Sequence, residues 1–505
     1  MSGEIKELQS LSPGMPIVFG GNQVTYVDDE LAEAFQPGDR LIVAQDTGAL
    51  LHIPADVAQI AADAVGEAYR AFQQMGSVDD DQVTSFYEEF ASRLADDAVF
   101  EAIGEANAGD VTRARERGRS TTRLVLDDRM RRGMIDGLRG WAGMSGGVGE
   151  VTRRVEHDGW AVEMVRAGLG VIGFVFEGRP NVFADATGVL RSGNTVVFRI
   201  GSDALGTAKA IMEHALEPAL ATSELPRGAA SLVATPSRAA GWAMFDDRRL
   251  ALAVARGSGP AVSQLGGVAR QAGTPVSLHG TGGAWIVAAD SADSDAFRMA
   301  VFNSLDRKVC NTLNTCCIVK SRAEDLIPVF LEALEAAGER RGAASKLDAA
   351  PEAMNRLADS WREETKIVGS DGVSLEPRTE PIDADALGEE WEWEESPEVT
   401  LHLVDDIDEA VELFNDQSPR FAASLISKDA DEHEAFYKAI DSPFVGNGFT
   451  RWVDGQYALN RPELGLSNWQ YGRLFGRGGV LSGDSAFTLR TRAIQTDPNV
   501  NRIDG

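Results

Sequence analysis

Residues 303–319 read Asn-Ser-Leu-Asp-Arg-Lys-Val-Cys-Asn-Thr-Leu-Asn-Thr-Cys-Cys-Ile-Val, and the rest of the chain is organised around this stretch. Cys310 follows a polar, cationic approach made by Asp306, Arg307 and Lys308. Nearby positive charge favours the thiolate, which is the nucleophilic form of cysteine. Two interpretations stay open from this stretch alone: Cys310 is a catalytic nucleophile, or it is one of the inert cysteines that intracellular proteins carry.

Cys316 and Cys317 begin an apolar run and are interpreted as core residues of a buried strand. Three cysteines, two of them adjacent, cannot build a disulfide framework. The sequence has neither a Cys-x-x-Cys pair nor clustered histidines, so we expect no metal site.

The composition limits the classes of function. A chain of 505 residues is too long for one core, so two or three domains are expected. The formal net charge of −30 argues against nucleic acid or an anionic membrane surface as a partner. The amino terminus lacks a basic segment followed by an apolar one, and no apolar run is long enough to span a bilayer. The expected compartment is the cytoplasm.

Residues 1–54 are interpreted as a small extra unit rich in β-strands. Alternating segments at residues 23–27 and 40–44 are bounded by Pro-Gly-Asp and Asp-Thr-Gly turns. We see no catalytic pattern in this unit, which is either an oligomerisation or docking module or a decorated amino terminus.

The pattern changes along the rest of the chain. Residues 55–143 show apolar residues at helical spacing, and residues 151–165 predict a hairpin that turns at Asp-Gly. From residue 171 strands and helices alternate, which predicts a mostly parallel sheet covered on both faces. Residues 339–395 are charged and poorly patterned, and their final acidic run, 389–395, is interpreted as a solvated loop.

Residues 168–173 read Gly-Leu-Gly-Val-Ile-Gly and match the dinucleotide fingerprint G-x-G-x-x-G, but we reject this match. The fingerprint works because its glycines follow a strand and open a helix. Here the glycines enter an apolar run to Phe176 that is itself a predicted strand, and a helix begins only after Asn181. By contrast, Gly-Ser-Gly at 257–259 leads from a predicted strand into a helix and suits a phosphate at the helix N-terminus.

Four segments taken together resemble the aldehyde dehydrogenase superfamily and, within it, the γ-glutamyl phosphate reductases. They are Leu-Gly-Val-Ile-Gly at 169–173, Phe-Glu-Gly-Arg-Pro-Asn-Val at 176–182, Ser-Gly-Asn-Thr-Val-Val at 192–197 and Val-Cys-Asn-Thr-Leu-Asn-Thr at 309–315. The resemblance runs from about residue 60 to about residue 494, so it leaves out the first 54 residues.

The resemblance implies an α/β fold with a Rossmann-like cofactor domain, an α/β catalytic domain and a β-hairpin oligomerisation flap. We expect the cofactor domain at 55–283, with the flap hairpin at 148–165, and the catalytic domain with Cys310 at 284–450. Residues 451–505 would form a carboxyl-terminal return and oligomerisation segment.

The resemblance also implies a mechanism. The Cys310 thiolate attacks an acyl phosphate, phosphate leaves, and the thioester is reduced to an aldehyde by a nicotinamide cofactor, reversibly with phosphate. Asn181 matches the side-chain amide that stabilises the oxyanion together with the Cys310 N–H. NADPH is the expected cofactor, with NADH as the alternative. The positions expected to bind it are Pro180, Arg199, Gly257, Ser258, Gly259 and Glu392.

Arg307, Lys308 and Asn311 are expected to bind substrate. The two cations either hold the leaving phosphate or face solvent as loop charges, and both interpretations stay open. Residues 278–283, where hydrolytic aldehyde dehydrogenases commonly place a glutamate base, hold His279 and no carboxylate. This absence fits transfer of the acyl group to phosphate or another acceptor, with His279 as a substitute base the less favoured interpretation.

Three functions follow as hypotheses. The first is an NADPH-dependent reductase of γ-glutamyl phosphate or an analogue. The second is an acyl-CoA reductase of the same fold, and the third is a non-catalytic member that serves as a binding protein. The segment before Cys310 and the aromatic segment 469–475 depart from the reductase pattern, which leaves the acyl group open. The expected partners are a second copy of the chain, in a dimer or tetramer, and a kinase that supplies the acyl phosphate.

Overall fold

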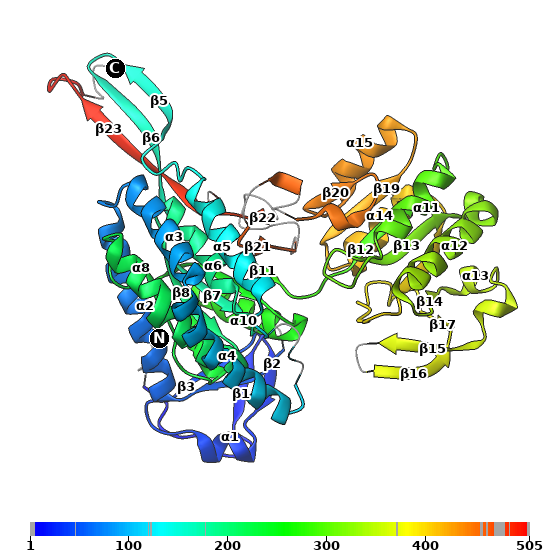
Figure 1. Cartoon of the computed structure of the whole chain (residues 1–505), viewed down its shortest axis with the longest axis horizontal. Coiled ribbons are helices and arrows are strands. Elements are labelled where there is room, and N and C mark those ends of the chain that lie inside the picture. Colours follow the sequence, from blue (N-terminus) through cyan, green and yellow to red (C-terminus); the bar gives the residue numbers. More distant parts are fainter. Residues whose placement is uncertain are drawn as a thin grey trace. The chain divides into compact units, whose positions relative to one another are not determined.

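The computed structural model describes residues 6–45, 47–119, 121, 124–176, 178–369, 372–454, 458–460, 463–468, 480–483 and 485–501. The chain forms two compact units. The first unit is Met1–Gly280 with Arg461–Gly465 and Leu481–Gly505, and the second unit is Thr281–Asn460 with Leu466–Val480. Each unit contains a parallel sheet with helices packed around it (Figure 1).

The first unit is built on a five-stranded parallel sheet in the order β11-β10-β7-β8-β9. Its strands are β7 (Val171–Phe176), β8 (Thr195–Ile200), β9 (Ala230–Leu232), β10 (Leu250–Arg256) and β11 (Val276–His279). Every residue of β7 and β8 is buried. These strands therefore lack alternation, because helices cover both faces of a parallel sheet.

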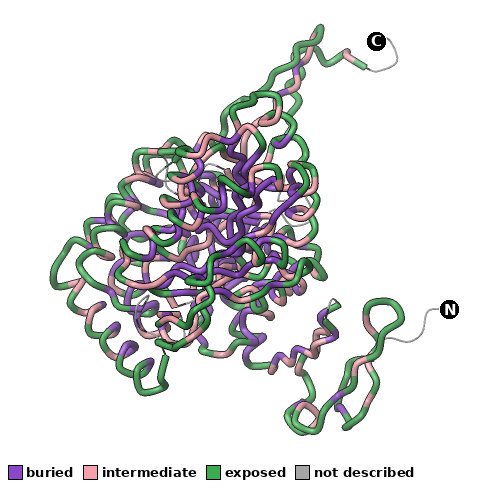
Figure 2. Tube along the Cα trace, turned by 90° about the vertical axis from the view of Figure 1, so that its right-hand side faces the viewer, coloured by how far each residue is buried: buried purple, intermediate pink, exposed green. Residues whose placement is uncertain are grey.

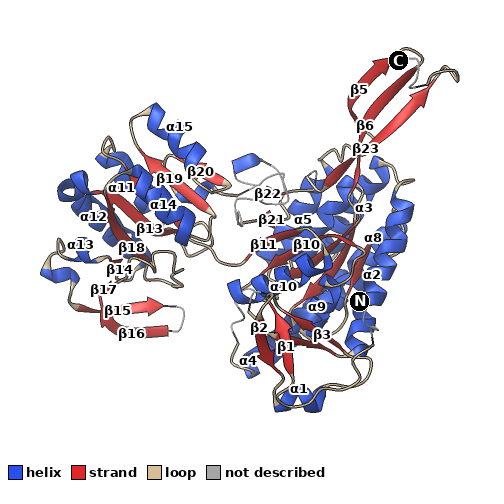
Figure 3. Ribbon diagram, turned by 180° about the vertical axis from the view of Figure 1, so that it is seen from behind, coloured by secondary structure: helices blue, strands red, loops and turns tan. Residues whose placement is uncertain are grey.

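Helices surround this sheet, as the ribbon in Figure 3 shows. They are α2 (Ala55–Met75), α3 (Asp80–Ala95), α4 (Asp97–Glu116), α5 (Asp128–Ala142), α6 (Val182–Ala186), α7 (Leu205–Ile211), α8 (Glu217–Thr222), α9 (Ala239–Phe245) and α10 (Gly259–Ala272). The side chains of Asp79, Asp96 and Asp127 accept backbone N–H bonds at the starts of α3, α4 and α5. Such caps satisfy amides that a helix leaves unpaired and fix where it begins.

The expected hairpin at 148–165 is present and is extended by a third strand. β5 (Val151–His157), β6 (Trp160–Gly168) and β23 (Phe487–Gln495) form an antiparallel sheet in the order β23-β6-β5, which we call the flap. Glu163 on β6 is bound by Arg154 and, at 2.6 Å, by Arg492, and these hydrogen bonds lower the pKa of the Glu163 carboxyl. Every residue of β5 is exposed (Figure 2).

The amino-terminal residues form short strands on the surface of the first unit. These elements are β1 (Pro16–Phe19), β2 (Gln23–Tyr26), α1 (Asp29–Ala34), β3 (Arg40–Val43) and β4 (Leu50–Ile53). Leu11, Val27 and Phe35 make a small core of their own. Leu51 and Ile53, however, belong to the large core that also contains α2 and α9.

The second unit is built on a seven-stranded parallel sheet in the order β17-β14-β18-β13-β12-β19-β20. Its strands are β12 (Ala284–Ala288), β13 (Leu313–Val319), β14 (Lys346–Ala349), β17 (Thr379–Pro381), β18 (Glu398–Val404), β19 (Ala422–Ile426) and β20 (Phe444–Gly446). The other elements are α11 (Ser294–Asn303), α12 (Ala323–Arg341), α13 (Pro351–Met354), α14 (Ile407–Gln417), α15 (Ala430–Ala439) and the hairpin of β15 (Glu364–Gly369) with β16 (Gly372–Pro377). Two-residue strands β21 (Gly465–Leu466) and β22 (Val480–Leu481) complete the order.

The charged segment 339–395 differs from its sequence-based interpretation. β14 and β17 lie inside it as sheet strands, and the Lys346 ammonium is bound by three carboxylates at 2.8–3.1 Å. The acidic run 389–395 is a loop whose residues 389, 392, 394 and 395 are exposed as expected, but Trp393 is 4% exposed and the Glu390 side chain is largely buried. Charged residues of β14 and β17 are paired with opposite charges, so these strands do not show the apolar pattern that would predict them.

None of the helices in the described part of the chain combines the length and the apolar character that a bilayer span requires.

Candidate active site

Cys310 lies in a closed loop of the second unit, between α11 and β13. The Thr312 hydroxyl donates to the Arg307 carbonyl at 2.6 Å and accepts the Val309 N–H at 2.9 Å. The Leu313 N–H returns to the Ser304 carbonyl at 3.1 Å. These bonds fix the backbone on both sides of Cys310, which is what a nucleophile needs to meet a substrate at a set angle.

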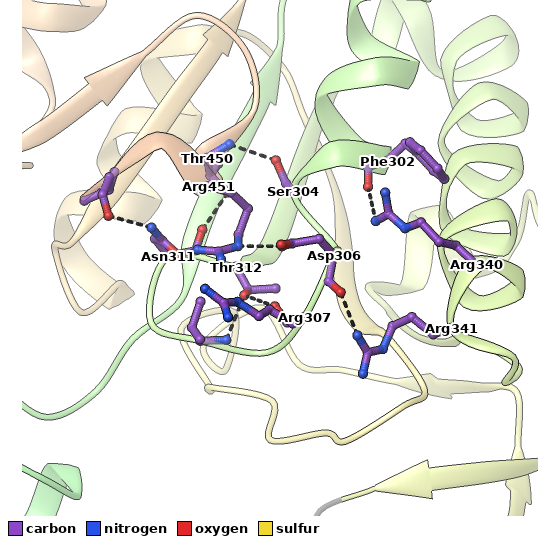
Figure 4. Close-up of polar contacts among 12 residues, drawn as sticks. Phe302, Ser304, Asp306, Arg307, Asn311, Thr312, Arg340, Arg341, Thr450 and Arg451 are labelled. Atoms are coloured by element: carbon purple, nitrogen blue, oxygen red, sulfur yellow. Dashed lines mark hydrogen bonds and ion pairs between the residues drawn. The ribbon is translucent and has the colours of Figure 1, made fainter. Parts of the chain in front are cut away.

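Asn311 anchors this loop to residues 450–453 (Figure 4). Its side-chain amide donates to the Val453 carbonyl at 2.7 Å, and its side-chain oxygen accepts from Arg451. Its backbone carbonyl accepts from the Thr450 hydroxyl at 2.7 Å, and Arg451 also binds Asp306 at 2.6 Å. Asn311 is 3% exposed, so its polar atoms hold the loop in place. Its substrate-binding role stays a prediction.

The three thiols of the chain fall into two environments. Cys316 and Cys317 lie on β13 with no exposed surface, and burial raises the pKa of both thiols, which confirms them as core residues. Cys310 is in no disulfide and is half-buried. It packs against an apolar cluster formed by Ala284, Phe421, Ala422, Phe444, Val453 and Leu466.

A glycine loop contacts the Cys310 backbone directly. The Gly283 N–H donates to the Cys310 carbonyl at 2.8 Å. A Cβ atom added at Gly282 would lie 2.6 Å from Cys310 Cα and 2.7 Å from the Glu390 carboxylate. Glycine at 282 therefore permits a close approach that no other residue allows. His279 ends β11 before this loop, with its carbonyl accepting from Gly257.

Glu390 is a site residue that sequence reasoning missed. One carboxylate oxygen accepts the Gly282 N–H at 2.6 Å, and the other binds the Lys308 ammonium at 2.7 Å. The Lys308 and Glu390 side chains are 9% and 15% exposed, so Lys308 is paired inside the loop. Arg307, by contrast, is exposed. The loop at 278–283 has no carboxylate of its own, but Glu390 brings one to Gly282 from 108 residues further along the chain.

The acidic run contains a sequence feature that indicates packing around Glu390. Trp391 and Trp393 flank the run's centre, and tryptophan side chains need apolar cover, so the run cannot extend freely into water. In the structure the Trp391 indole N–H donates to Thr400 at 2.8 Å, and its backbone N–H donates to Asn314 at 3.0 Å. Glu392, expected near the cofactor, is exposed, and its cofactor role stays a prediction.

The first unit contains a cavity of about 880 Å³ at the ends of β7, β8 and β10 beside α9 and α10. Gly257, Ser258 and Arg199 line it, and Gly259 is the first residue of α10, whereas their cofactor role stays a prediction. Its volume is in the range of small-molecule sites. The α10 N-terminus supplies the positive end of a helix dipole, which favours a phosphate there.

Arg199 is the buried cation of this cavity. It is 9% exposed, one guanidinium nitrogen donates to the Ser237 carbonyl at 3.1 Å, and its Nε has no hydrogen-bond partner among the described residues. Burial, with a smaller contribution from nearby Arg238, lowers the pKa of Arg199. A buried cation facing a second cation is stabilised by an anion bound between them.

Asn181 and Pro180 lie just before α6 in the first unit. The Asn181 amide donates to the Asp185 carboxyl at 3.1 Å. Packing around Asp185, and then the charge of Glu463, raise the pKa of Asp185 to about 7. Asp185 therefore sets the orientation of the amide that sequence reasoning assigned to the oxyanion, and it was not among the predicted residues.

Comparisons with known proteins agree with this geometry. The sequence pattern of the aldehyde dehydrogenase family matches residues 148–369. The γ-glutamyl phosphate reductase of Brucella anthropi is 30% identical over 400 residues, which cover 76% of this chain and 85% of that protein. The structure of γ-glutamyl phosphate reductase from Thermotoga maritima superposes with a TM-score of 0.76 at 25% identity, covering 88% of this chain and all of that one. An engineered glycolyl-CoA reductase with bound NADP⁺ has a TM-score of 0.57 at 16% identity, over 87% of this chain and 98% of that one, and shares the fold.

The family match and these relatives define an oxidoreductase that acts on aldehydes. The two parallel α/β units, one with a cavity and one with Cys310 in a fixed loop, agree with this class. The chain belongs to the aldehyde dehydrogenase family, and its relatives within that family include γ-glutamyl phosphate reductases. The resemblance inferred from the sequence is thereby confirmed, as is the α/β fold.

Proposed function

We propose that this enzyme reduces an acyl phosphate, γ-glutamyl phosphate or an analogue of it, to the aldehyde with NADPH, through a thioester on Cys310. The observation that carries the proposal is the environment of Cys310. Of the three thiols, all of them in the described part of the chain, Cys310 alone is not sealed in the core, and its loop is fixed by hydrogen bonds on both sides.

In this reaction the residues of the chain have the following roles. The Cys310 sulfur attacks the acyl carbon, the carbonyl oxygen becomes negative, and the phosphate leaves with the electron pair of the broken C–O bond. The Cys310 N–H and the Asn181 amide donate to that oxygen, and loss of one such donor costs on the order of 3 kcal/mol of barrier. A bound nicotinamide cofactor supplies the hydride that reduces the thioester. Cys310 is released as the thiolate when the aldehyde forms.

Arg307 is the better candidate of the two cations for the leaving phosphate. Its guanidinium is exposed, and a guanidinium binds phosphate through two hydrogen bonds. The Lys308 charge is already neutralised by Glu390 at 2.7 Å. We assign Lys308 and Glu390 to holding the loop 281–283 against Cys310.

The preference for NADPH is supported by Arg199 and Arg238. NADPH carries a 2′-phosphate that NADH lacks, and a phosphate beside these guanidinium groups relieves their repulsion. The related fold of the engineered glycolyl-CoA reductase carries NADP⁺. Arg199→Met is expected to raise the KM for NADPH at least tenfold and to change the KM for NADH less than threefold. Equal loss for both cofactors would contradict the preference.

One observation favours a second candidate, the reduction of an acyl-CoA. Lys308 is paired with Glu390, which leaves one cation fewer for a leaving phosphate. Aldehyde oxidation is therefore to be measured with phosphate, with coenzyme A and with neither. Turnover that depends on phosphate supports the acyl phosphate reductase, and turnover that depends on coenzyme A supports the alternative.

The chemistry is tested by trapping the thioester. The protein is incubated with acyl phosphate or acyl-CoA without cofactor and analysed by intact mass. Cys310→Ser is expected to abolish the thioester and the reduction, whereas Cys316→Ala, a change at a buried thiol on β13, retains both. A thioester that forms normally in Cys310→Ser would overturn the assignment. Nucleotide binding with no thioester from any donor would support the non-catalytic hypothesis.

We also propose that the flap joins subunits. Val151, Val155, Leu489 and Ile494 are large apolar residues of this three-stranded sheet that are 37–39% exposed. Such residues on exposed strands are typical of an assembly surface. Val155→Asp is expected to reduce the oligomer to monomers in analytical ultracentrifugation, and an unchanged sedimentation coefficient would contradict this role.

A further inference from the structure

We propose that the amino-terminal residues form part of the nucleotide site: the β3–β4 hairpin supplies an apolar wall that contacts the adenosine half of the cofactor. This inference rests on the proposed NADPH-dependent function. It assigns a role to residues 6–54, which lie outside the family resemblance and show no catalytic pattern in the sequence.

The hairpin is fixed to the first unit rather than loosely attached. Leu51 and Ile53 are 3% and 0% exposed in the core they share with α2 and α9. Asp39 ties the start of the hairpin to α2, since one of its carboxylate oxygens accepts the Ala55 N–H at 2.8 Å. The other oxygen lies 2.7 Å from the His52 ring nitrogen. The hairpin therefore has a defined position relative to the core.

The end of the hairpin reaches the cavity that contains Arg199. Ala49, Leu50 and Leu51 line that cavity of about 880 Å³, together with Trp242 of α9. Ala49 and Leu50 are half-buried, and each also packs against a core: Ala49 against the core of α2 and α9, and Leu50 against the small core of Leu11, Val27 and Phe35. The apolar surface that they leave open toward the cavity becomes covered when a ligand binds, and this burial favours binding.

The adenosine half is the part of the cofactor that fits this wall. The ring that carries the hydride has to reach the thioester on Cys310, which belongs to the second unit. The described residues that line this cavity all belong to the first unit, so we assign it to the other half of the dinucleotide. In it Arg199 and the start of α10 suit phosphates, whereas the hairpin and Trp242 offer apolar surface for a flat purine.

The test narrows the cavity at its apolar wall. Ala49→Trp places a large side chain at the cavity, and Val18→Trp makes the matched change at a β1 residue that is 67% exposed and does not line it. Isothermal titration of the full chain with NADPH and with adenosine 2′,5′-bisphosphate gives the dissociation constants. We expect Ala49→Trp to weaken both at least tenfold and Val18→Trp to change neither by more than twofold.

The outcomes separate this inference from the proposed function. If the wild type binds both nucleotides and Ala49→Trp binds them equally well, the hairpin wall is wrong and the proposed function stands. If the wild type binds neither, both fail. A measurement on the wild type guards against a misfolded variant: adenosine 2′,5′-bisphosphate is expected to slow amide hydrogen exchange at residues 49–53. Unchanged exchange there, with the nucleotide bound, would also overturn the inference.

Discussion

Replacing Glu390 by glutamine tests how the loop around Cys310 is held. Both carboxylate oxygens of Glu390 accept hydrogen bonds, one from the Gly282 N–H at 2.6 Å and one from Lys308 at 2.7 Å. A glutamine side chain has a single acceptor oxygen, so its NH₂ group must face one of these two donors. The substitution therefore breaks one hydrogen bond and leaves the Lys308 charge unpaired.

The expected cost follows from the burial of the pair. Lys308 and Glu390 are 9% and 15% exposed, and removing one partner of a buried pair typically costs 3–5 kcal/mol. Because some solvent still reaches both side chains, we expect Glu390→Gln to lower the free energy of unfolding by about 3 kcal/mol. The change also loosens the loop 281–283 against the Cys310 backbone, so kcat should fall more than the KM for the cofactor changes.

Urea denaturation followed by circular dichroism measures the free energy, and steady-state kinetics measures the activity. The matched control is Glu434→Gln, which breaks a pair with Lys438 whose side chains are 64% and 69% exposed and costs at most about 0.5 kcal/mol. In a double-mutant cycle, Lys308→Met with Glu390→Gln should cost less than the sum of the single changes, because no buried charge is left unpaired. Equal stability of Glu390→Gln and Glu434→Gln, or an additive cycle, would refute this reasoning.

Other substitutions test the loop beside Cys310 and two titratable groups, Asp185 and Lys346. Gly282→Ala puts a methyl group 2.6 Å from Cys310 Cα and should lower kcat at least tenfold, whereas Gly448→Ala, with nothing within 4 Å, should leave it unchanged. Asp185 has a pKa raised to about 7 in the folded protein, so the folded state holds a proton that the unfolded state releases near pH 4, and wild-type stability falls as pH rises from about 4 to 7. The stability of Asp185→Asn relative to wild type should therefore rise by up to about 1.4 kcal/mol per pH unit in that window and level off above it, in thermal unfolding at a series of pH values. Lys346→Met leaves three carboxylates without their cation and should lower the unfolding free energy by about 3–5 kcal/mol at pH 7, and much less at pH 4, where carboxylates take up protons.

The strands that the sequence predicts well are those buried by apolar residues alone. Val171–Phe176 forms β7 as expected, and α6 begins only at Val182, which confirms the rejection of the G-x-G-x-x-G match at 168–173. The hairpin turn is at the predicted Asp-Gly, where Gly159 has a φ of +76°. In each case the local pattern and the tertiary environment favour the same structure.

The sequence predicts poorly where charges are buried. β14 reads Lys-Leu-Asp-Ala, an alternation that indicates a solvated edge, yet all four residues are buried. Lys346 has its carboxylate partners on β16, β17 and β18, and packing around Asp348, with the nearby Glu398, raises the pKa of the Asp348 carboxyl to about 8. These partners come from segments 30–52 residues away, so a local window cannot identify them.

The candidate site also contains residues that the sequence can identify and residues that it cannot. Cys310, Arg199 and the 257–259 turn could be found from the sequence, because each has a local signature or a place in the family resemblance. Glu390 could not, since it binds the Gly282 N–H, which is 108 residues away in the sequence. Asp185 is only four residues from the Asn181 amide that it binds, but the burial that raises its pKa depends on the fold. The contribution of Ala49 to the cavity depends on the packing of β4 against α9, which also lies beyond any local pattern.

Because Cys316 and Cys317 are buried, Cys310 can be quantified separately with a thiol reagent. A thiol reagent such as dithionitrobenzoate should modify one equivalent of cysteine in the native protein and three after unfolding, because Cys316 and Cys317 have no exposed surface and raised pKa values. Under the proposed role of Cys310, the fast-reacting fraction gives the concentration of active-site thiols in a preparation. The reagent would then titrate the active site without labelled substrate.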